Sequence, residues 1–446
     1  MSRSEAGAAG TAGAEAAAAV GGTFNVEAAR RRFPALRAPG APIFFDNAAG
    51  AQVPDEVVAA VREHMESRNV QRGGRYDRSL AVDAVIAATR RRLAAFLNAA
   101  SPEEIYFGQN ATSVMRTAAE AIRPQLRPGD RVVITELDHE ANVGPWLRLE
   151  RSGAEPRWWK TRGGAEARLE LDDLAAILRE GRVRLVALPL ASNTSGRLVD
   201  VAAAVRLARE HGAWTFVDAV HFGPHGPIDV QALGADFLAF SGYKIFGPHI
   251  GFLWGRRDLL NALEPAREFF IPATTPYAFE SGTQNFEGMA GLSAALHYLA
   301  TAEIPEAREA PAHVSIESCD EREAAALHAS LARGMSRIRA YEIDLAARLL
   351  TVLRERPDIS ILGDPDPAHA ATRLPTVSFT VKGKSATAIV DHLATHGIQS
   401  REGHMYAPRL LRAAGFDPDA GVARVSLCHY NTTAEIEQFA EALRLL

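Results

Sequence analysis

The chain has 446 residues, a formal net charge of -5, 47% hydrophobic residues and 23% charged residues. This composition allows a large core, divided into two or three domains or into one large α/β domain with a smaller partner. The mild acidity gives no electrostatic reason to expect nucleic-acid binding. The two cysteines, Cys319 and Cys428, are too few for a disulfide framework or a cysteine-rich metal cluster, and they fit a reducing, cytoplasmic location.

The N-terminus is rich in alanine and glycine and lacks the basic and apolar regions of a signal peptide. We therefore expect residues 1–22 to form a disordered tail. No run of about twenty apolar residues is present, so we expect no membrane span.

Short apolar runs alternate with amphipathic stretches through the middle of the chain, and each run ends in polar residues. The expected strands are 103–107, 131–136, 183–190, 213–217 and 235–240. The alternation predicts an α/β fold with a mainly parallel sheet that is covered on both faces. Because ligands of such sheets bind beyond the carboxyl ends of the strands, we expect the polar clusters to face one crevice.

The pattern changes after about residue 295. We expect a large domain over 46–300, a polar insertion or linker over 301–322, and a smaller α/β domain over 323–446. The small domain should begin with a long helix, roughly 323–356, and contain strands near 376–383 and 423–431. Residues 23–45 are expected to pack with it.

Lys244 closely follows an expected strand, in the sequence SGYK. It could reach solvent, or it could lie in a dry pocket that lowers its pKa and makes the amine nucleophilic, as a Schiff-base lysine requires. Asp218, at another strand end, could pair with a protonated pyridine nitrogen or could cap a turn. His139 could stack on a cofactor ring or could be structural.

A phosphate group needs backbone N–H groups at a helix start, together with hydroxyl groups. The residues Asn110-Ala111-Thr112-Ser113 open an expected helix directly after a strand, and Ser241 lies near Lys244 in the sequence. The alternative role for Thr112 is a simple helix N-cap.

Eight motifs occur in a characteristic order along the chain: FFDNAAGAQVP, GQNATS, ELDHEANVGPW, SNTSG, VDAVH, SGYK, FESGTQNFEG and YNTTAEIEQF. This set resembles the class V aminotransferase group of fold-type I pyridoxal-phosphate enzymes, and within it the cysteine desulfurase-like family. The resemblance extends from about residue 40 to the C-terminus. It implies pyridoxal 5'-phosphate (PLP) as cofactor, an amino-acid substrate and a homodimer with shared active sites.

The resemblance implies a role for each matching residue. Lys244 would bind the cofactor covalently, Asp218 would pair with its ring nitrogen and His139 would stack on the ring, and these three are the expected catalytic residues. The other expected cofactor contacts lie near the phosphate or the 3-oxygen: Ala111, Thr112, Asn193, His221, Ser241 and Tyr243. Thr283 would reach the phosphate in the other protomer.

The chain departs from the family pattern at three places. Asn110-Ala111-Thr112 replaces Gly-Thr-Thr, and His221 replaces a glutamine. The family's Arg-x-Gly-x-x-Cys-Ala reads REGHMYA here, so Arg401 is retained while Tyr406 takes the place of the cysteine that accepts sulfur. Arg401 is expected to bind the substrate carboxylate. Further expected substrate contacts are Asn193, His404, Tyr406 and Arg75.

Since a tyrosine hydroxyl cannot accept sulfur, we expect chemistry at Cα and Cβ without a protein persulfide. The first hypothesis is a C–S lyase that acts by α,β-elimination on a cysteine-derived or other β-substituted amino acid. The alternatives are an aminotransferase, an epimerase or a decarboxylating or oxidatively deaminating enzyme, and more remotely a non-catalytic scaffold. Tyr406 and His404 could protonate a leaving thiolate or only line the pocket. No metal site is expected, because His211, His221 and His225 match no tight ligand motif.

Overall fold

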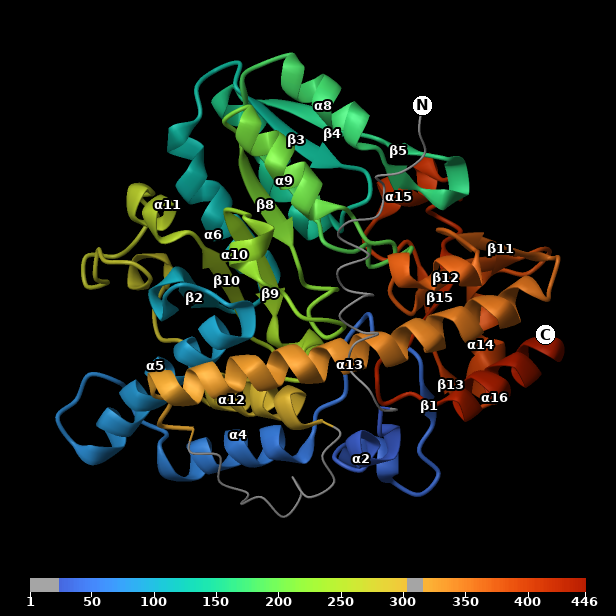
Figure 1. Ribbon diagram of the computed structural model, residues 1–446, viewed down its shortest axis with the longest axis horizontal. Helices are drawn as coiled ribbons and strands as arrows, with labels where there is room; N and C mark the ends of the chain where they lie inside the picture. Colours follow the sequence, from blue (N-terminus) through green and yellow to red (C-terminus); the bar gives the residue numbers. More distant parts are fainter. Residues whose placement is uncertain (1–23, 303–315) are drawn as a thin grey trace.

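The computed structural model describes residues 24–302 and 316–446 (Figure 1). The tail expected over 1–22 and most of the linker expected over 301–322 lie outside these residues. The described residues contain a seven-stranded sheet and a four-stranded sheet, and we call the parts of the chain built around them the large domain and the small domain. The long helix α13 (Glu321–Arg354) runs from beneath the large sheet to the small domain.

The large sheet has the strand order β2-β10-β9-β8-β7-β3-β4. Strands β4, β3, β7, β8 and β9 pair in parallel, and β10 is antiparallel to both of its neighbours. This confirms the α/β class and the mainly parallel sheet. The strand bounds are β2 (Ile105–Gly108), β3 (Arg131–Thr135), β4 (Glu155–Trp159), β7 (Val183–Pro189), β8 (Trp214–Asp218), β9 (Phe237–Ser241) and β10 (Gly251–Gly255).

Three expected strands begin later than the sequence suggested: 213–217 begins at Trp214, 235–240 at Phe237 and 103–107 at Ile105. In the last case residues 102–104 form a 3-10 turn. The cause is a capping box, in which Ser101 and Glu104 bond to each other's backbone N–H groups.

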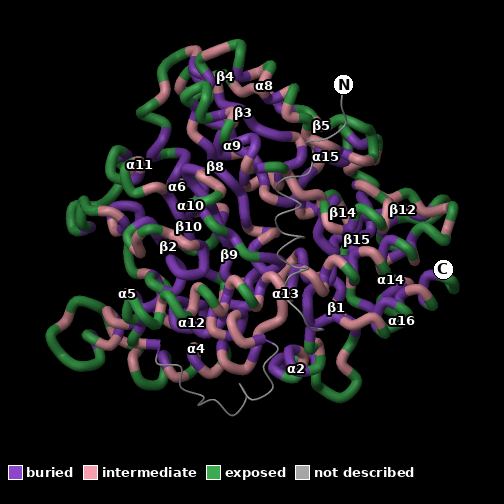
Figure 2. The backbone as a smooth tube through the Cα atoms, viewed as in Figure 1, coloured by how far each residue is buried: buried purple, intermediate pink, exposed green. Residues whose placement is uncertain are grey.

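Both faces of the large sheet are buried, as the continuous apolar strands predicted. Alternate residues of one strand enter two different hydrophobic clusters, as with Val186 and Ala187 in β7. Helices α5 (Asp77–Leu97), α9 (Val201–Glu210) and α12 (Phe286–Thr301) cover one face, and α6 (Ala111–Ile122) and α7 (Gly144–Leu147) cover the other. The strands therefore lie in the buried interior of the molecule (Figure 2).

The small domain contains an antiparallel sheet of order β11-β12-β15-β14. The expected strand 423–431 ends early, at Ser426, because the Asn431 side chain accepts the Cys428 N–H at 2.8 Å and closes a turn. Helix α13 starts at Glu321, two residues before the expected start, where Asp320 caps it. The elements are β11 (Ile359–Leu362), β12 (Thr376–Val381), β14 (Arg401–Gly403), β15 (Val422–Ser426), α14 (Ala386–Thr395), α15 (Pro408–Ala413) and α16 (Thr433–Arg444).

The N-terminal segment joins the small domain through β1 (Ile43–Phe44), which pairs in parallel with β13 (Ile398–Gln399). An isolated bridge then joins Asp46 to Ser426, which carries residues 46–48 to the edge of the large sheet. The other elements are α2 (Val26–Arg30), α3 (Pro34–Arg37), α4 (Asp55–Ser67), α8 (Leu171–Arg179), α10 (Val230–Leu233), α11 (Arg257–Ala262), β5 (Thr161–Arg162) and β6 (Arg168–Leu169). None of the helices in the described ranges is long and apolar enough to cross a membrane.

Candidate active site

Lys244 lies in the 3-10 turn that follows β9, and its side chain is buried. The ammonium group donates a hydrogen bond to the carbonyl of Ala48. Burial, followed by the positive charge of Arg424, lowers the pKa of Lys244 to about 7. A large share of this amine is therefore neutral at neutral pH, as a nucleophile or general base requires.

Asp218 is the last residue of β8, the strand next to β9. Its carboxylate accepts the N–H of Val220 at 2.9 Å. Burial raises the pKa of Asp218 to about 6, although the Val220 bond and the nearby Lys244 favour the charged form. The carboxylate is therefore mainly ionised above pH 6 and would pair well with a protonated ring nitrogen.

The first turn of α6 has the geometry of an anion site. Asn110 caps the helix by accepting the Ser113 N–H at 2.9 Å, while Ser113 accepts the Asn110 N–H. Within the described residues, the N–H groups of Ala111 and Thr112 have no protein acceptor. Such open N–H groups at a helix start favour a phosphate.

Gly251 of β10 brings this turn to the lysine. It lies opposite Gly108 of β2 on one side and opposite Ser241 of β9 on the other. A Cβ atom at Gly251 would lie 2.2 Å from the backbone carbon of Asn110. Only glycine therefore allows β10 to pass this close to the start of α6.

The turn after β3 holds His139 firmly. The Asp138 carboxylate accepts hydrogen bonds from Thr135 at 2.5 Å and from Asn142 at 2.9 Å. The His139 Nδ1 accepts the Ala141 N–H at 3.0 Å, which leaves Nε2 to carry the proton of the neutral ring. Burial, with Lys244 and Arg424, lowers the pKa of His139 to about 4, so the ring stays neutral. A neutral flat ring suits stacking on a cofactor.

The other expected cofactor residues have protein partners. The His221 Nε2 lies 3.1 Å from the Thr376 hydroxyl, and burial holds the pKa of His221 well below its ordinary value. The Tyr243 ring stacks on His249. The Asn193 side chain donates to the carbonyl of Met405 at 2.8 Å, so it contacts the 401–407 segment.

Met405 and Tyr406 are consecutive residues with left-handed backbone angles, φ 52 and φ 57. For residues other than glycine this conformation is strained and needs support from its surroundings. The Tyr406 N–H donates to His404 at 3.0 Å, and the Tyr406 carbonyl accepts the N–H of Glu140 at 2.8 Å. These bonds, with that from Asn193, fix Tyr406 beside the His139 turn.

Arg401 does not point freely into an open pocket. Its Nε and Nη2 bind both carboxylate oxygens of Asp46, at 2.9 Å each to Oδ2. The same carboxylate accepts a bond of 3.2 Å from Arg424, which lies on the neighbouring strand β15. Asp46, Arg424 and Asp138 were not among the expected site residues. Arg424 carried a usable signal, since it is a charged residue within an otherwise apolar strand.

Thr283 and Arg75 lie in two loops that contact each other, because the Gln71 side chain donates to the Thr283 hydroxyl at 3.1 Å. Both residues are exposed. The two loops thus form one exposed surface on the large domain.

The histidines 211, 221 and 225 do not all come together. His211 is exposed and bonds to the carbonyl of Leu207. His225 contacts the edge of His221 and pairs at 2.7 Å with Glu342 of α13, which is fully buried. Cys428 lies in the same cluster.

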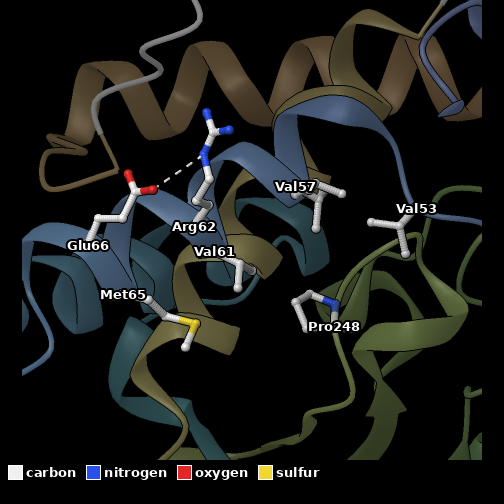
Figure 3. A pocket seen from close by; sticks show the side chains of 8 residues that line it. Val53, Val57, Val61, Arg62, Met65, Glu66 and Pro248 are labelled. Carbon is white, nitrogen blue, oxygen red and sulfur yellow. Dashed lines mark ion pairs between the residues drawn. The ribbon is translucent and has the colours of Figure 1, made fainter.

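An apolar groove lies along α4 on the outside of the large domain (Figure 3). Its volume is about 610 Å³, and Val58 and Met65 in it are 53% and 56% exposed. An Arg62–Glu66 ion pair lies at its edge. The lining residues are Val53, Val57, Val58, Val61, Met65 and Pro248, with Arg62 and Glu66.

The residues around Lys244 match the chemistry of PLP. A buried, readily neutralised amine, a carboxylate, a flat neutral ring and an open helix start face one region of the large sheet. The family model described as Aminotransferase class-V matches residues 43–318 and 322–439.

Individual relatives cover nearly the whole chain. The Aminotransferase-like protein FGM3 of Gibberella zeae is 33% identical over 431 residues, which is 95% of this chain and 99% of the relative. A cysteine desulfurase of Klebsiella pneumoniae is 33% identical over 441 residues, 95% of this chain and 98% of the relative. The solved structure of the cysteine desulfurase CsdA from Escherichia coli is 28% identical with a TM-score of 0.78, covering 95% of this chain and 98% of that chain.

Proposed function

Because the chain belongs to the aminotransferase class-V family of PLP-dependent enzymes, we propose that it is a C–S lyase. The reaction is the α,β-elimination of a cysteine-derived or other β-substituted amino acid. The products from an S-substituted cysteine and water are a thiol, pyruvate and ammonia.

The observation that carries this proposal is Tyr406. In the REGHMYA segment it takes the place of the sulfur-accepting cysteine that the resemblance to desulfurases implies. Cys319 and Cys428, the two cysteines of the chain, are 2% and 1% exposed and lie outside that segment. Burial raises the pKa of both thiols, so neither readily forms a nucleophilic thiolate.

The chain's own residues supply the other roles. When bound, the cofactor supplies an electron sink for negative charge at the substrate Cα. Lys244, with its pKa near 7, is suited to take the Cα proton. Tyr406 is 61% exposed in the fixed loop, and its hydroxyl is suited to give a proton to the departing thiolate, with His404 as its neighbour.

Arg424 is the arginine proposed to attract the substrate carboxylate, because it is almost fully buried and its positive charge acts on Lys244. Arg401, 47% exposed and paired with Asp46, lies opposite it on the neighbouring strand. Asn193 holds the Arg424 guanidinium through its carbonyl at 3.0 Å.

A second candidate is transamination, favoured by the similarity to the Aminotransferase-like protein FGM3. The same Lys244 base would then return the proton to a different carbon atom. Elimination consumes a β-substituted substrate and releases pyruvate, whereas transamination needs no β-substituent.

The active form is proposed to be a homodimer. The exposed apolar groove along α4 is a suitable contact for a second copy, because a contiguous apolar face of this kind is costly in water. Phe269, 96% exposed, and Phe270 add apolar surface on the same domain. The loops of Thr283 and Arg75 would then serve the site of the second copy.

Product analysis tests the proposed reaction. The wild-type holoenzyme is incubated with S-methyl-L-cysteine, and pyruvate, ammonia and methanethiol are measured against a Lys244→Ala control. Stoichiometric release of the three products is expected from the wild type alone. A second incubation with L-cysteine, followed by trapping of protein persulfides, is expected to give none. A persulfide on Cys319 or Cys428 would contradict the proposal.

A further inference from the structure

Arg401 and Arg424 are direct partners across the β14–β15 strand pair. Like charges at directly opposite positions repel each other and destabilise a sheet. Here the carboxylate of Asp46, which enters from the N-terminal segment, lies between them.

Asp46 binds the two arginines unequally. The Arg401 Nε donates to both carboxylate oxygens of Asp46, at 3.2 Å and 2.9 Å, and its Nη2 forms an ion pair with Oδ2 at 2.9 Å. Arg424 donates one bond of 3.2 Å to Asp46 and one of 3.0 Å to the carbonyl of Asn193. Asp46 therefore pairs more closely with Arg401 than with Arg424.

The charge count follows from these contacts. Among these three side chains, two arginines and one aspartate leave one net positive charge, which one substrate carboxylate would neutralise. We infer that Asp46 restricts the site to α-amino acids with a single carboxylate, by occupying the arginine that would bind a second one. This inference rests on the proposed amino-acid chemistry and specifies its substrate class.

A matched pair of ligands tests this role. L-Norvaline and L-glutamate have equal chain lengths and differ by the side-chain carboxylate, and neither has a β-leaving group. Their dissociation constants for the holoenzyme are measured by calorimetry and from the visible cofactor band. Asp46→Asn keeps the shape of the side chain and removes its charge. Asp344→Asn removes an equal charge at an exposed position on α13 and is the control.

We expect the wild type and Asp344→Asn to bind L-norvaline at least about tenfold more tightly than L-glutamate. In Asp46→Asn the ratio should move by at least about tenfold toward L-glutamate, with the cofactor band retained. An unchanged ratio, or an equal loss of affinity for both ligands, would show that Asp46 only neutralises the arginine pair. The test measures binding and not pyruvate release. Its result can therefore be interpreted even if the enzyme does not catalyse elimination.

Discussion

The ring of Tyr406 lies 5.4 Å, centroid to centroid, from the ring of His139. The two residues are far apart in the sequence, and the bond from the Glu140 N–H to the Tyr406 carbonyl joins their loops. If His139 stacks on the cofactor, Tyr406 stands directly beside the reacting atoms.

Tyr406→Phe tests the proposed acid. The change keeps the ring against His139 and removes the proton, so kcat for S-alkyl cysteines should fall by about 100-fold with little change in KM. With S-(4-nitrophenyl)-L-cysteine, whose thiolate leaves without protonation, the loss should shrink to a few-fold. An equal decrease in kcat with both substrates would indicate that the Tyr406 hydroxyl contributes to packing and not to proton transfer.

Attachment of the cofactor should report the lowered pKa of Lys244. Only the neutral amine reacts, so the rate at which apoenzyme recovers its visible band with PLP should rise with pH and reach half of its maximum near the pKa of about 7. An ordinary lysine would show this rise near pH ~10. Replacing Arg424 by Gln removes a charge that lowers this pKa, so the curve should move to higher pH. If the midpoint of the pH dependence is the same in the Arg424 variant, the charge of Arg424 does not lower the pKa of Lys244.

Gly251→Ala tests the close approach of the α6 turn. The new methyl group would overlap the Asn110 backbone at 2.2 Å, so the start of α6 must move away from β10. We expect a destabilisation of about 1–3 kcal/mol and weaker PLP binding. Gly144→Ala is the control, since its Cβ meets nothing closer than 3.6 Å. Unfolding in urea and equilibrium dialysis of PLP measure the two effects.

Glu342→Ala should leave His225 without its buried partner. Leaving a buried polar group without its hydrogen-bond partner typically costs about 1–3 kcal/mol, and urea unfolding should show a decrease of that size. The exposed Asp344–Arg348 pair lies on the same helix, and Asp344→Asn should change stability by less than about 1 kcal/mol. Similar decreases in the free energy of unfolding for the two variants would mean that the buried Glu342–His225 pair stabilises the protein no more than the exposed Asp344–Arg348 pair does.

The sequence predicted the large sheet well, because near-continuous apolar strands and amphipathic helices are local patterns. It missed β4 and β10, although Gly251 in β10 allows the close approach of the α6 turn. The position of Lys244 and Asp218 after neighbouring strands followed from the same local patterns, since parallel strands end at one edge.

Local sequence patterns could not predict the contacts of Arg401. Asp46 is separated from Arg401 by 355 positions and from Arg424 by 378, and no periodicity links such residues. Their meeting depends on the β1–β13 pairing and on the bridge from Asp46 to Ser426.

The sequence by itself therefore determined the fold class, the position of Lys244 after a strand and the presence of Tyr406 where the resemblance implies a cysteine, because each is recorded in a short stretch of residues. Only the tertiary structure decided that Lys244 is buried and which charges surround it. Burial and distance set the pKa of Lys244 and the pairing of Asp46 with two arginines, and both quantities exist only after distant segments have packed together.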